Sequence, residues 1–266
     1  MEKLTLIKLG GSLITDKTQP FTERKGTIAR LARELSNIQN DKSRKFIIGH
    51  GGGSYPHFPA KKYQTNLGVI NDNSYMGIAK VQDAASKLNR ILTEQLIKAN
   101  IQAVSFSPSS FMISNKGKIV SSYIKPIIVA LNNKIVPVVY GDVIFDQTVG
   151  CTIASTEMVL NHLARSFRHT YEIEKIIYCG ITHGVYDRHG KTIEKIDAKI
   201  YSKIQNEIGS SAGIDVTGGM NTKVKEALEL SKRENISSYI INGNLKNNLI
   251  NAYHNKPFVG TIIAYK

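Results

Sequence analysis

Residues 46–63 read FIIGHGGGSYPHFPAKKY, and the rest of the chain is organised around this stretch. Its apolar start, Phe46 to Ile48, is typical of a buried parallel strand. Four glycines follow at 49 and 51–53, and glycine lets a ligand lie directly against backbone amides. A strand that ends in such N–H donors suits a phosphate, and His57 follows within reach of a phosphoryl oxygen. Taken alone, the loop is read equally well as a surface turn with an incidental histidine.

A second loop of the same type lies upstream. Leu4 to Leu9 predicts a strand, and this strand ends at Gly10-Gly11-Ser12. Lys8 lies near the end of the strand and Lys17 follows the loop. Ligands of open α/β sheets collect at the carboxyl ends of the strands, so these lysines are candidate phosphate contacts.

Apolar runs alternate with helical spacings along the whole chain. We expect strands at 4–9, 46–48, 101–106, 135–140, 175–179 and 238–241, and helices at 28–38, 81–96 and from 156 onward. This alternation predicts a largely parallel sheet covered by helices on both faces. We expect the polar stretch 187–211 to form a surface excursion, 215–220 to open a helix, and 259–265 to close the chain as an edge strand.

Glycine-rich turns follow several of the predicted strands. They lie at 10–11, 49–53, 141 and 243, with 218–219 opening a helix. Together, such turns at the ends of parallel strands predict a continuous phosphate-binding groove. Phosphoryl transfer requires positioning and charge neutralisation more than covalent chemistry. Lys8, Lys17 and Lys223 are suitable point charges, while the glycine turns supply amides.

Composition limits the class of protein. The chain has 266 residues, of which 41% are hydrophobic and 21% charged, and it carries a net charge of +14. Its lysines are scattered, which favours a solvated surface first and a field for anionic ligands second; we expect no nucleic-acid partner.

No apolar run approaches the ~20 residues that span a bilayer, so no membrane association is expected. Cys151 and Cys179 are too few for a disulfide framework. The seven histidines show no ligand spacing, so no metal site of the protein's own is expected. These observations indicate a cytoplasmic enzyme.

Several short motifs occur in an order that resembles the amino acid kinase superfamily. They are Lys8-Leu-Gly-Gly-Ser, His50-Gly-Gly-Gly-Ser through His57, Tyr140-Gly-Asp142, Asp215-Val-Thr-Gly-Gly-Met220 and Asn242-Gly-Asn244. Within that superfamily the chain is most similar to the isopentenyl phosphate kinases. The most specific marks of this similarity are His57, Pro-Ala-Lys-Lys-Tyr at 59–63 and Pro-Ser-Ser-Phe at 108–111. The resemblance covers essentially the whole chain.

The resemblance implies an α/β fold of the open αβα sandwich type with a mostly parallel central sheet. It implies one domain over 1–266, in which approximately 1–145 bind the acceptor and 146–266 the nucleotide. The implied activity is ATP-dependent phosphorylation of isopentenyl phosphate to isopentenyl diphosphate. It further implies ATP and Mg²⁺ as cofactors, a small-molecule phosphate substrate and a homodimer.

The resemblance also assigns roles to individual residues. The catalytic group would be His57, Lys8, Lys17 and Lys223. The acceptor would be bound by Gly52, Gly53, His57, Gly141 and Ser155. The nucleotide would be bound by Lys8, Gly10, Gly11, Lys17, Gly180, Tyr186, Gly218 and Lys223.

Two segments depart from the superfamily pattern. Ala154-Ser-Thr-Glu157 stands where the family has Ser-Gly-Asp and an acidic residue, and Gly180-Ile-Thr-His183 replaces an aspartate-rich nucleotide motif. Thr156 cannot carry the charge that orients the lysines, but Glu157 could act from the next position. Two alternatives remain: a kinase of the same fold for another small phosphate or phosphonate, and a non-catalytic member that binds nucleotides or oxyanions.

Overall fold

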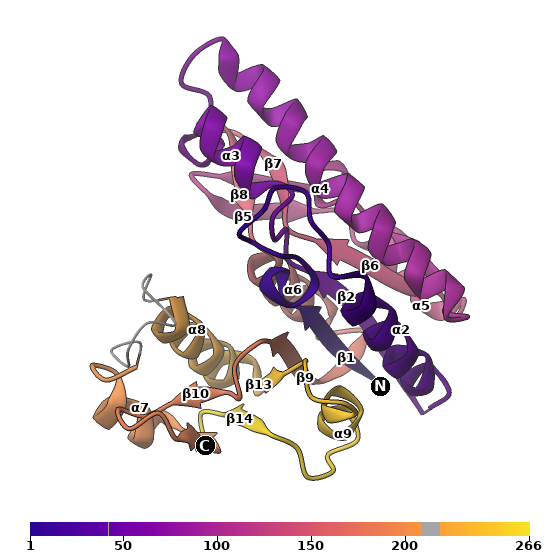
Figure 1. Ribbon diagram of the computed structural model, residues 1–266, viewed down its shortest axis with the longest axis vertical. Helices are drawn as coiled ribbons and strands as arrows, with labels where there is room; N and C mark the ends of the chain where they lie inside the picture. Colours follow the sequence, from indigo (N-terminus) through magenta and orange to yellow (C-terminus); the bar gives the residue numbers. More distant parts are fainter. Residues whose placement is uncertain (42, 209–218) are drawn as a thin grey trace.

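The strands and helices alternate to build an α/β structure whose central layer is an eight-stranded sheet (Figure 1). The computed structural model describes residues 1–41, 43–208 and 219–266. The order across the sheet is β12 (Lys195–Ile196), β14 (Gly260–Ile263), β13 (Ser237–Asn242), β9 (Tyr171–Gly180), β1 (Glu2–Leu9), β2 (Arg44–His50), β6 (Val136–Tyr140) and β3 (Ala103–Ser105). β14 runs antiparallel to β13, and the other neighbouring pairs of this sheet are parallel. The prediction of a mostly parallel sheet is confirmed.

The central strand β1 shows why helices cover both faces. Ile7 and Leu9 pack into one buried cluster, while Leu4 and Leu6 pack into another. Successive side chains of a strand point to opposite faces, so a strand with apolar side chains on both faces needs cover on both sides. The sheet therefore lies between two hydrophobic layers.

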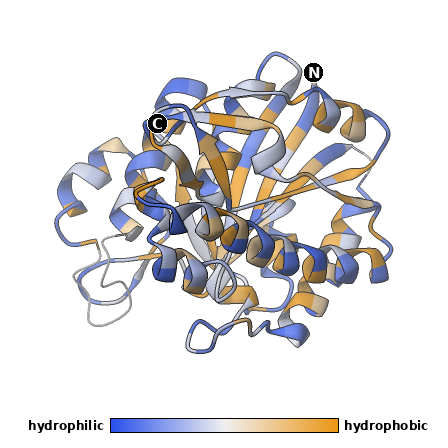
Figure 2. Ribbon diagram, turned by 90° about the horizontal axis from the view of Figure 1, so that it is seen from above, coloured by the Kyte–Doolittle hydropathy of each residue, from blue (hydrophilic) through white to orange (hydrophobic). Residues whose placement is uncertain are grey.

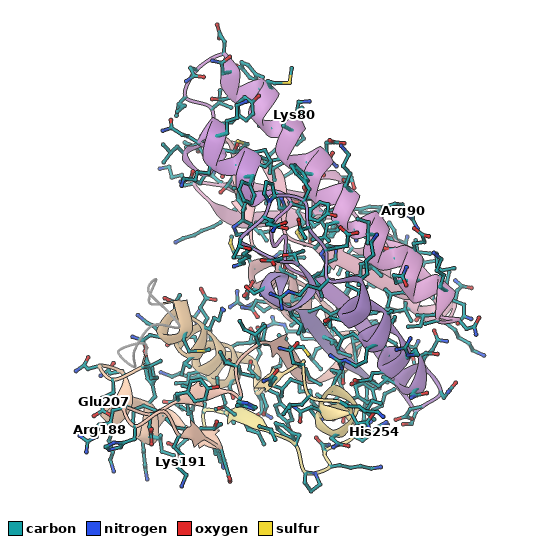
Figure 3. All side chains as sticks on the ribbon, in the orientation of Figure 1. Lys80, Arg90, Arg188, Lys191, Glu207 and His254 are labelled. Atoms are coloured by element: carbon teal, nitrogen blue, oxygen red, sulfur yellow. The ribbon has the colours of Figure 1, made fainter. Side chains whose placement is uncertain are left out.

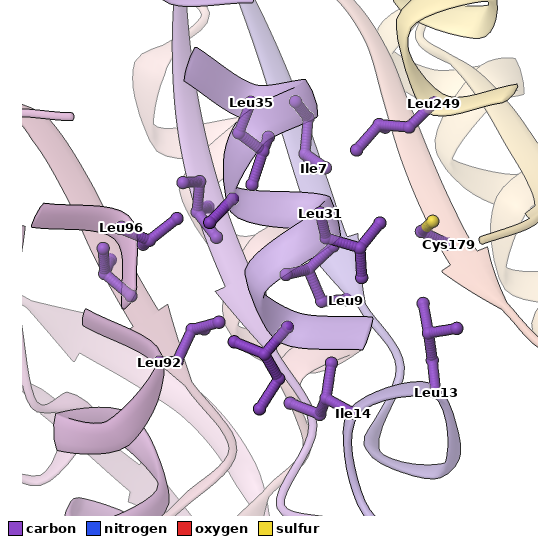
Figure 4. Packing of buried hydrophobic residues seen from close by; sticks show 14 of the residues in the cluster. Ile7, Leu9, Leu13, Ile14, Leu31, Leu35, Leu92, Leu96, Cys179 and Leu249 are labelled. Atoms are coloured by element: carbon purple, nitrogen blue, oxygen red, sulfur yellow. The ribbon is translucent and has the colours of Figure 1, made fainter. Parts of the chain in front are cut away.

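Each face is covered by its own set of helices. The first face carries α1 (Gly11–Ile14), α2 (Lys25–Gln39), α4 (Asn73–Lys98) and α9 (Asn248–Tyr253). The second carries α5 (Lys125–Asn132), α6 (Thr156–Phe167) and α8 (Gly219–Glu234). Figure 4 shows Leu31 and Leu35 of α2, Leu92 and Leu96 of α4 and Leu9 of β1, which belong to one buried cluster. This packing is that of an open αβα sandwich.

The distribution of polarity agrees with this layering. In Figure 2 the strands at the centre are mainly hydrophobic and the surrounding helices carry hydrophilic stretches. Lys80, Arg90 and Lys191 project outward from the body in Figure 3. No helix among the described residues is long and apolar enough to cross a membrane.

A second sheet packs against one end of α4. Its strands are β5 (Lys118–Ser122), β4 (Met112–Asn115), β7 (Asp142–Asp146) and β8 (Gly150–Ala154), in that order. Val81 of α4 packs on Val143 and Cys151 of this sheet. Three short helical segments accompany it: α3 (His57–Tyr63), η1 (Thr65–Leu67) and η2 (Pro108–Ser110). The second sheet forms one wall of the site described below.

The prediction of an edge strand at 259–265 is wrong. β14 lies between β13 and β12, with Lys195 paired to Ile262 and Ile196 paired to Ile263. The two-residue strand β12 is therefore the edge. The cause is the 187–211 segment, which was expected to be only a surface excursion but adds β12 outside the last strand of the chain.

Further elements lie within this segment or just before it. β10 (Val185–Tyr186) pairs with β11 (Thr192–Ile193) as an antiparallel hairpin, and α7 (Ala198–Ile204) follows β12. The predicted helix opening at 215–220 is described only from Gly219, the first residue of α8. Residues 215–218 lie outside the described part of the chain.

Candidate active site

Glycine turns follow four parallel strands, β1, β2, β6 and β13, at the same edge of the main sheet. The turn glycines continue the hydrogen-bond ladder beyond the strands: Gly10 N–H donates to Cys179 O at 2.8 Å, Gly51 N–H to Leu9 O at 2.9 Å, Gly141 N–H to His50 O at 3.2 Å and Gly243 N–H to Gly180 O at 2.8 Å. Each turn is thereby attached to the neighbouring strand. The predicted groove of glycine turns is one connected surface.

Two of these turns approach so closely that a side chain would not fit between them. A Cβ on Gly11 would lie 2.5 Å from the backbone nitrogen of Gly53. Gly53 has φ +54°, and a Cβ there would lie 2.0 Å from Thr15 Oγ1. Left-handed backbone with no room for a Cβ requires glycine. The sequence of three glycines after His50 therefore reflects contact with the first turn.

A cavity of about 910 Å³ opens over these turns. Most of the residues assigned to the site from sequence line it: Lys8, Gly10, Gly11, Lys17, Gly52, Gly53, His57, Gly141, Ser155, Gly180 and Lys223. They come from both halves of the chain, so the fold brings the two predicted binding halves to one cavity.

One predicted residue, Tyr186, is not among the lining residues. Tyr186 lies in β10, where its hydroxyl accepts a hydrogen bond from the His183 backbone N–H at 2.9 Å, and it does not line this cavity. It helps to shape the turn after β9. Gly218 lies outside the described residues, and the neighbouring Gly219 lines the cavity at the start of α8.

The lysines form a positively charged group around one carboxylate. Lys8 pairs with Glu157 of α6, and the charges of Lys223 and Lys17 both act on Lys8. Burial lowers the pKa of Lys8, and these two cations lower it further, while Glu157 offsets part of the effect. Burial alone would raise the pKa of Glu157, but Lys8 outweighs it and holds that pKa below its usual value. Such a group of cations attracts a polyanion.

His57 is the first residue of α3 and faces the same cavity. Partial burial and the charge of Lys17 lower its pKa. The imidazole and the Lys17 ammonium therefore lie near enough to repel when both are charged. An anion between them would remove this repulsion.

The start of α6 is fixed by its own side chains. Ser155 is the N-cap, and its hydroxyl accepts a hydrogen bond from Met158 N–H at 3.1 Å. Thr156 Oγ1 donates to His50 O at 2.7 Å. Thr156 thus joins α6 to β2, and the carboxylate that pairs with Lys8 is that of Glu157.

Sequence reasoning did not assign Asp142 to the site. Asp142 lines the cavity and accepts hydrogen bonds from Ser107 Oγ at 3.0 Å and from Ser109 N–H at 3.2 Å. Burial raises its pKa. These contacts join the Tyr140-Gly-Asp142 motif to the Pro108-Ser-Ser motif, and the presence of both motifs in the sequence was the signal that could have found them.

The cavity has further lining residues that sequence reasoning missed. They are Ala60, Lys61, Asn66, Val81 and Ile153. They come from α3, η1, α4 and β8, and no local pattern joins them. They give part of the cavity lining a mixed apolar and polar character.

His50 is buried beneath the glycine turn and is not exposed to the cavity. Its Nε2 is 3.1 Å from Asn89 Nδ2 and its Nδ1 is 3.2 Å from Gly51 O. Burial lowers its pKa to about 4. The partners assign a neutral ring in which Nδ1–H donates to Gly51 O, so His50 supports the turn.

Among the described residues, no group of three or more His, Cys, Asp or Glu side chains could hold a metal ion. The acidic residues that line the described part of the cavity are Asp142 and Glu157, and both have protein partners. Any divalent cation in this cavity would need most of its ligands from a bound substrate and water.

Comparisons with known proteins agree with this geometry. The sequence model of the amino acid kinase family matches residues 3–242. The chain is 33% identical over 257 residues to the isopentenyl phosphate kinase of Methanocaldococcus jannaschii, with 94% of each chain covered. It is 31% identical over 276 residues to the isopentenyl phosphate kinase of Methanothermobacter thermautotrophicus, with 99% of this chain and 100% of that one covered.

A solved structure is similar over the same extent. It is described as isopentenyl phosphate kinase, and it superposes with a TM-score of 0.82 at 27% sequence identity. The match covers 98% of this chain and 100% of that chain. The two chains therefore share one overall fold over nearly their whole length.

Proposed function

Because the chain belongs to the amino acid kinase family, we propose that it transfers the γ-phosphoryl group of ATP to isopentenyl phosphate and forms isopentenyl diphosphate. The observation that carries this proposal is that Lys8, Lys17, Lys223 and Glu157 line one cavity together with the glycine turns and His57, and that the charges of Lys17 and Lys223 act on the paired Lys8. Its relatives, named isopentenyl phosphate kinases, support this acceptor.

The acceptor occupies the half formed by approximately residues 1–145. Its phosphate lies against the amides of Gly52 and Gly53, with Gly141 and Ser155 on the facing side and His57 above. Its hydrocarbon tail contacts Ala60, Val81 and Ile153, which line the same cavity. Charge at one end and apolar surface at the other match an alkyl phosphate.

The nucleotide occupies the half formed by approximately residues 146–266, together with the first glycine turn. Gly10 and Gly11 offer backbone amides to its phosphates, and Lys8, Lys17 and Lys223 offer charge. Apart from its two chain neighbours, no described residue has an atom within 4 Å of the place where a Cβ on Gly180 would lie, so Gly180 leaves room for the nucleotide. Gly218 and Tyr186 remain proposed nucleotide contacts, the second through the turn that it shapes.

In the reaction, an oxygen of the acceptor phosphate attacks the γ-phosphorus of ATP. The bond between that phosphorus and the β–γ bridging oxygen breaks, and ADP leaves with the electron pair. Two anions must approach each other, so donors that meet the transferred group in flight lower the barrier most. Lys8, Lys17 and Lys223 neutralise that group. His57 lies between the transferred phosphoryl group and the acceptor phosphate and donates a hydrogen bond to them.

Mg²⁺ is proposed to enter with ATP. The described cavity has no acidic cluster, and Mg²⁺ commonly keeps several waters and binds through substrate phosphates. When bound it supplies charge neutralisation on the nucleotide. The side chains described above then only have to orient the phosphate chain.

The assembly and the place of the reaction are also proposals. Similarity to the isopentenyl phosphate kinases supports a homodimer and a cytoplasmic reaction.

A second candidate is a kinase of the same fold for another small phosphate or phosphonate. Lys61 and Asn66 at the acceptor side favour it, because they provide polar groups near the tail. The non-catalytic alternative is weaker, since Glu157 supplies the carboxylate that Thr156 lacks.

A turnover assay tests these functions. Purified protein is mixed with Mg-ATP and, separately, isopentenyl phosphate, shorter and longer alkyl phosphates, and an alkyl phosphonate, while ADP and the phosphorylated product are measured. The highest kcat/KM with isopentenyl phosphate supports the proposal. A higher value with another acceptor supports the second candidate. ATP binding without ADP formation from any acceptor supports the non-catalytic member.

A further inference from the structure

The loop that carries Lys17 is closed at its base and packed against the second glycine turn. Thr15 and Glu23 form an antiparallel bridge. Asp16 N–H donates to Thr22 O at 2.8 Å, and Arg24 N–H donates to Ile14 O at 2.7 Å. Lys17 therefore projects from a short closed loop whose place depends on what holds residues 15–23.

Ser54 is one of the residues that hold this loop. It is 1% exposed, and its hydroxyl accepts a hydrogen bond from Thr22 N–H at 3.1 Å and donates one to Thr22 O at 3.3 Å. Its backbone N–H donates to Thr15 Oγ1 at 3.0 Å, and its carbonyl accepts from Phe21 N–H at 3.2 Å. One buried serine thus contacts the loop of Lys17 at three places.

Tyr55 makes a second attachment. Its hydroxyl donates to Glu23 Oε2 at 2.5 Å, and this hydrogen bond is the main cause that lowers the pKa of Glu23. Its ring packs edge-on against Phe21, with 5.4 Å between the ring centroids. A hydrogen bond to an ionised, partly buried carboxylate is among the stronger kinds.

Ser54 and Tyr55 also immediately precede Pro56 and His57. The segment that holds the Lys17 loop therefore also leads directly into His57, at the start of α3. We infer that Ser54 and Tyr55 are positioning residues that fix Lys17 relative to His57. Neither residue needs to touch the substrate. This inference rests on the proposed function, because Lys17 and His57 act on the same pair of phosphates only in the proposed phosphoryl transfer.

The effect on the reaction follows from the required precision. Lys17 must meet the transferred group while His57 meets the acceptor, and a displacement of about 1 Å can cost ~10²-fold in rate. An exposed lysine on a free loop would sample many positions. The contacts of Ser54 and Tyr55 restrict it before the substrates bind, which reduces the ordering that the transition state requires.

The test uses Tyr55→Phe, which removes the hydroxyl but keeps the ring on Phe21, and Ser54→Ala as a second variant. Tyr171→Phe is the matched control, because the Tyr171 hydroxyl donates to Asn132 at 2.8 Å and Tyr171 does not line the cavity. Unfolding temperatures of all variants are measured first. If Ser54→Ala does not fold, it is set aside, and Tyr55→Phe alone then tests the inference.

The main measurement is the pKa of His57, followed by NMR of its ring protons in the free protein. Lys17 lowers this pKa, so release of its loop should raise it. Lys17→Gln gives the full rise, and Tyr55→Phe should give part of it. Tyr171→Phe should give none. With isopentenyl phosphate, we expect Tyr55→Phe to lower kcat about tenfold with little change in ATP affinity.

The double variant Lys17→Gln/Tyr55→Phe completes the cycle. If Tyr55 acts through Lys17, adding Tyr55→Phe to Lys17→Gln changes neither the pKa of His57 nor kcat any further. An unchanged His57 pKa in Tyr55→Phe, or a full additional loss of kcat in the double variant, would overturn the inference. The NMR result needs no substrate, so it stands even if the turnover assay rejects the proposed acceptor.

Discussion

Lys8 and Glu157, 149 positions apart in the sequence, form an ion pair at the carboxyl end of β1. Their side chains are 11% and 16% exposed. The pair joins the central strand to the first turn of α6, and the charges of Lys17 and Lys223 act on its lysine. The family pattern has an aspartate at the position of Thr156. In this chain the carboxylate comes from the next position, Glu157.

Glu157→Gln tests the use of this carboxylate. We expect kcat/KM to fall about tenfold or more, because Lys8 loses the partner that orients it. Burial already lowers the pKa of Lys8 and Glu157 raises it. Without Glu157, Lys8 should lose its proton at a lower pH, so the alkaline limb of the pH–rate profile should move toward lower pH.

The control is Glu94→Gln, which removes an exposed ion pair with Lys98 on α4. It should change neither the rate nor the profile. Unchanged turnover in Glu157→Gln would mean that the site orients its lysines without this carboxylate, and α6 would then lose only ~0.3–1 kcal/mol of helix-dipole stabilisation.

His57→Ala should reduce transfer to isopentenyl phosphate by ~10²-fold or more, since it removes a donor that meets the crowded charge of the transition state. ATP affinity, measured by calorimetry, should be nearly unchanged because His57 serves the acceptor side. His169→Ala, an exposed histidine outside the cavity, is the control. Equal losses of ATP affinity and transfer would place His57 outside the chemistry.

Replacement of Lys8, Lys17 or Lys223 by alanine should each lower kcat/KM by well over tenfold. Each lysine offers charge to the same phosphate group, and removal of one donor of this kind costs ~10²-fold. Circular dichroism should show a retained fold. Lys80→Ala on the exposed face of α4 provides the comparison (Figure 3). Wild-type kinetics in all three variants would contradict the mechanism.

His50 predicts a pH dependence of stability. Burial lowers its pKa in the folded state to about 4, against an ordinary value of 6.5. Between these values the unfolded chain binds a proton that the folded chain does not, so stability falls as the pH drops from 6.5 to 4. A shift of this size corresponds to about 3 kcal/mol.

Urea unfolding at several pH values measures this slope. His50→Gln should flatten it, whereas His169→Gln, at an exposed position, should leave it unchanged. An equally steep loss of stability in His50→Gln would show that other groups cause the acid sensitivity.

The sequence by itself determined the class of fold and most of the lining of the cavity. Apolar runs such as Leu4 to Leu9 required burial on both faces, and the glycine turns marked the edge of the sheet where a phosphate can meet backbone amides. These features are local: they depend on the order of neighbouring residues and on what the backbone permits. For the same reason Lys8, Lys17 and His57 were recognisable from their places after strands and turns.

Only the tertiary structure decided which distant residues meet. The pairing of Glu157 with Lys8, the contacts of Asp142 with Ser107 and Ser109, and the attachment of Tyr55 to Glu23 join residues from separate elements. Likewise, β12 forms the edge of the sheet because Lys195 and Ile196, far from β14 in the sequence, pair with the free side of that strand. Such contacts depend on how whole elements pack in space, which the spacing of residues along one element does not specify.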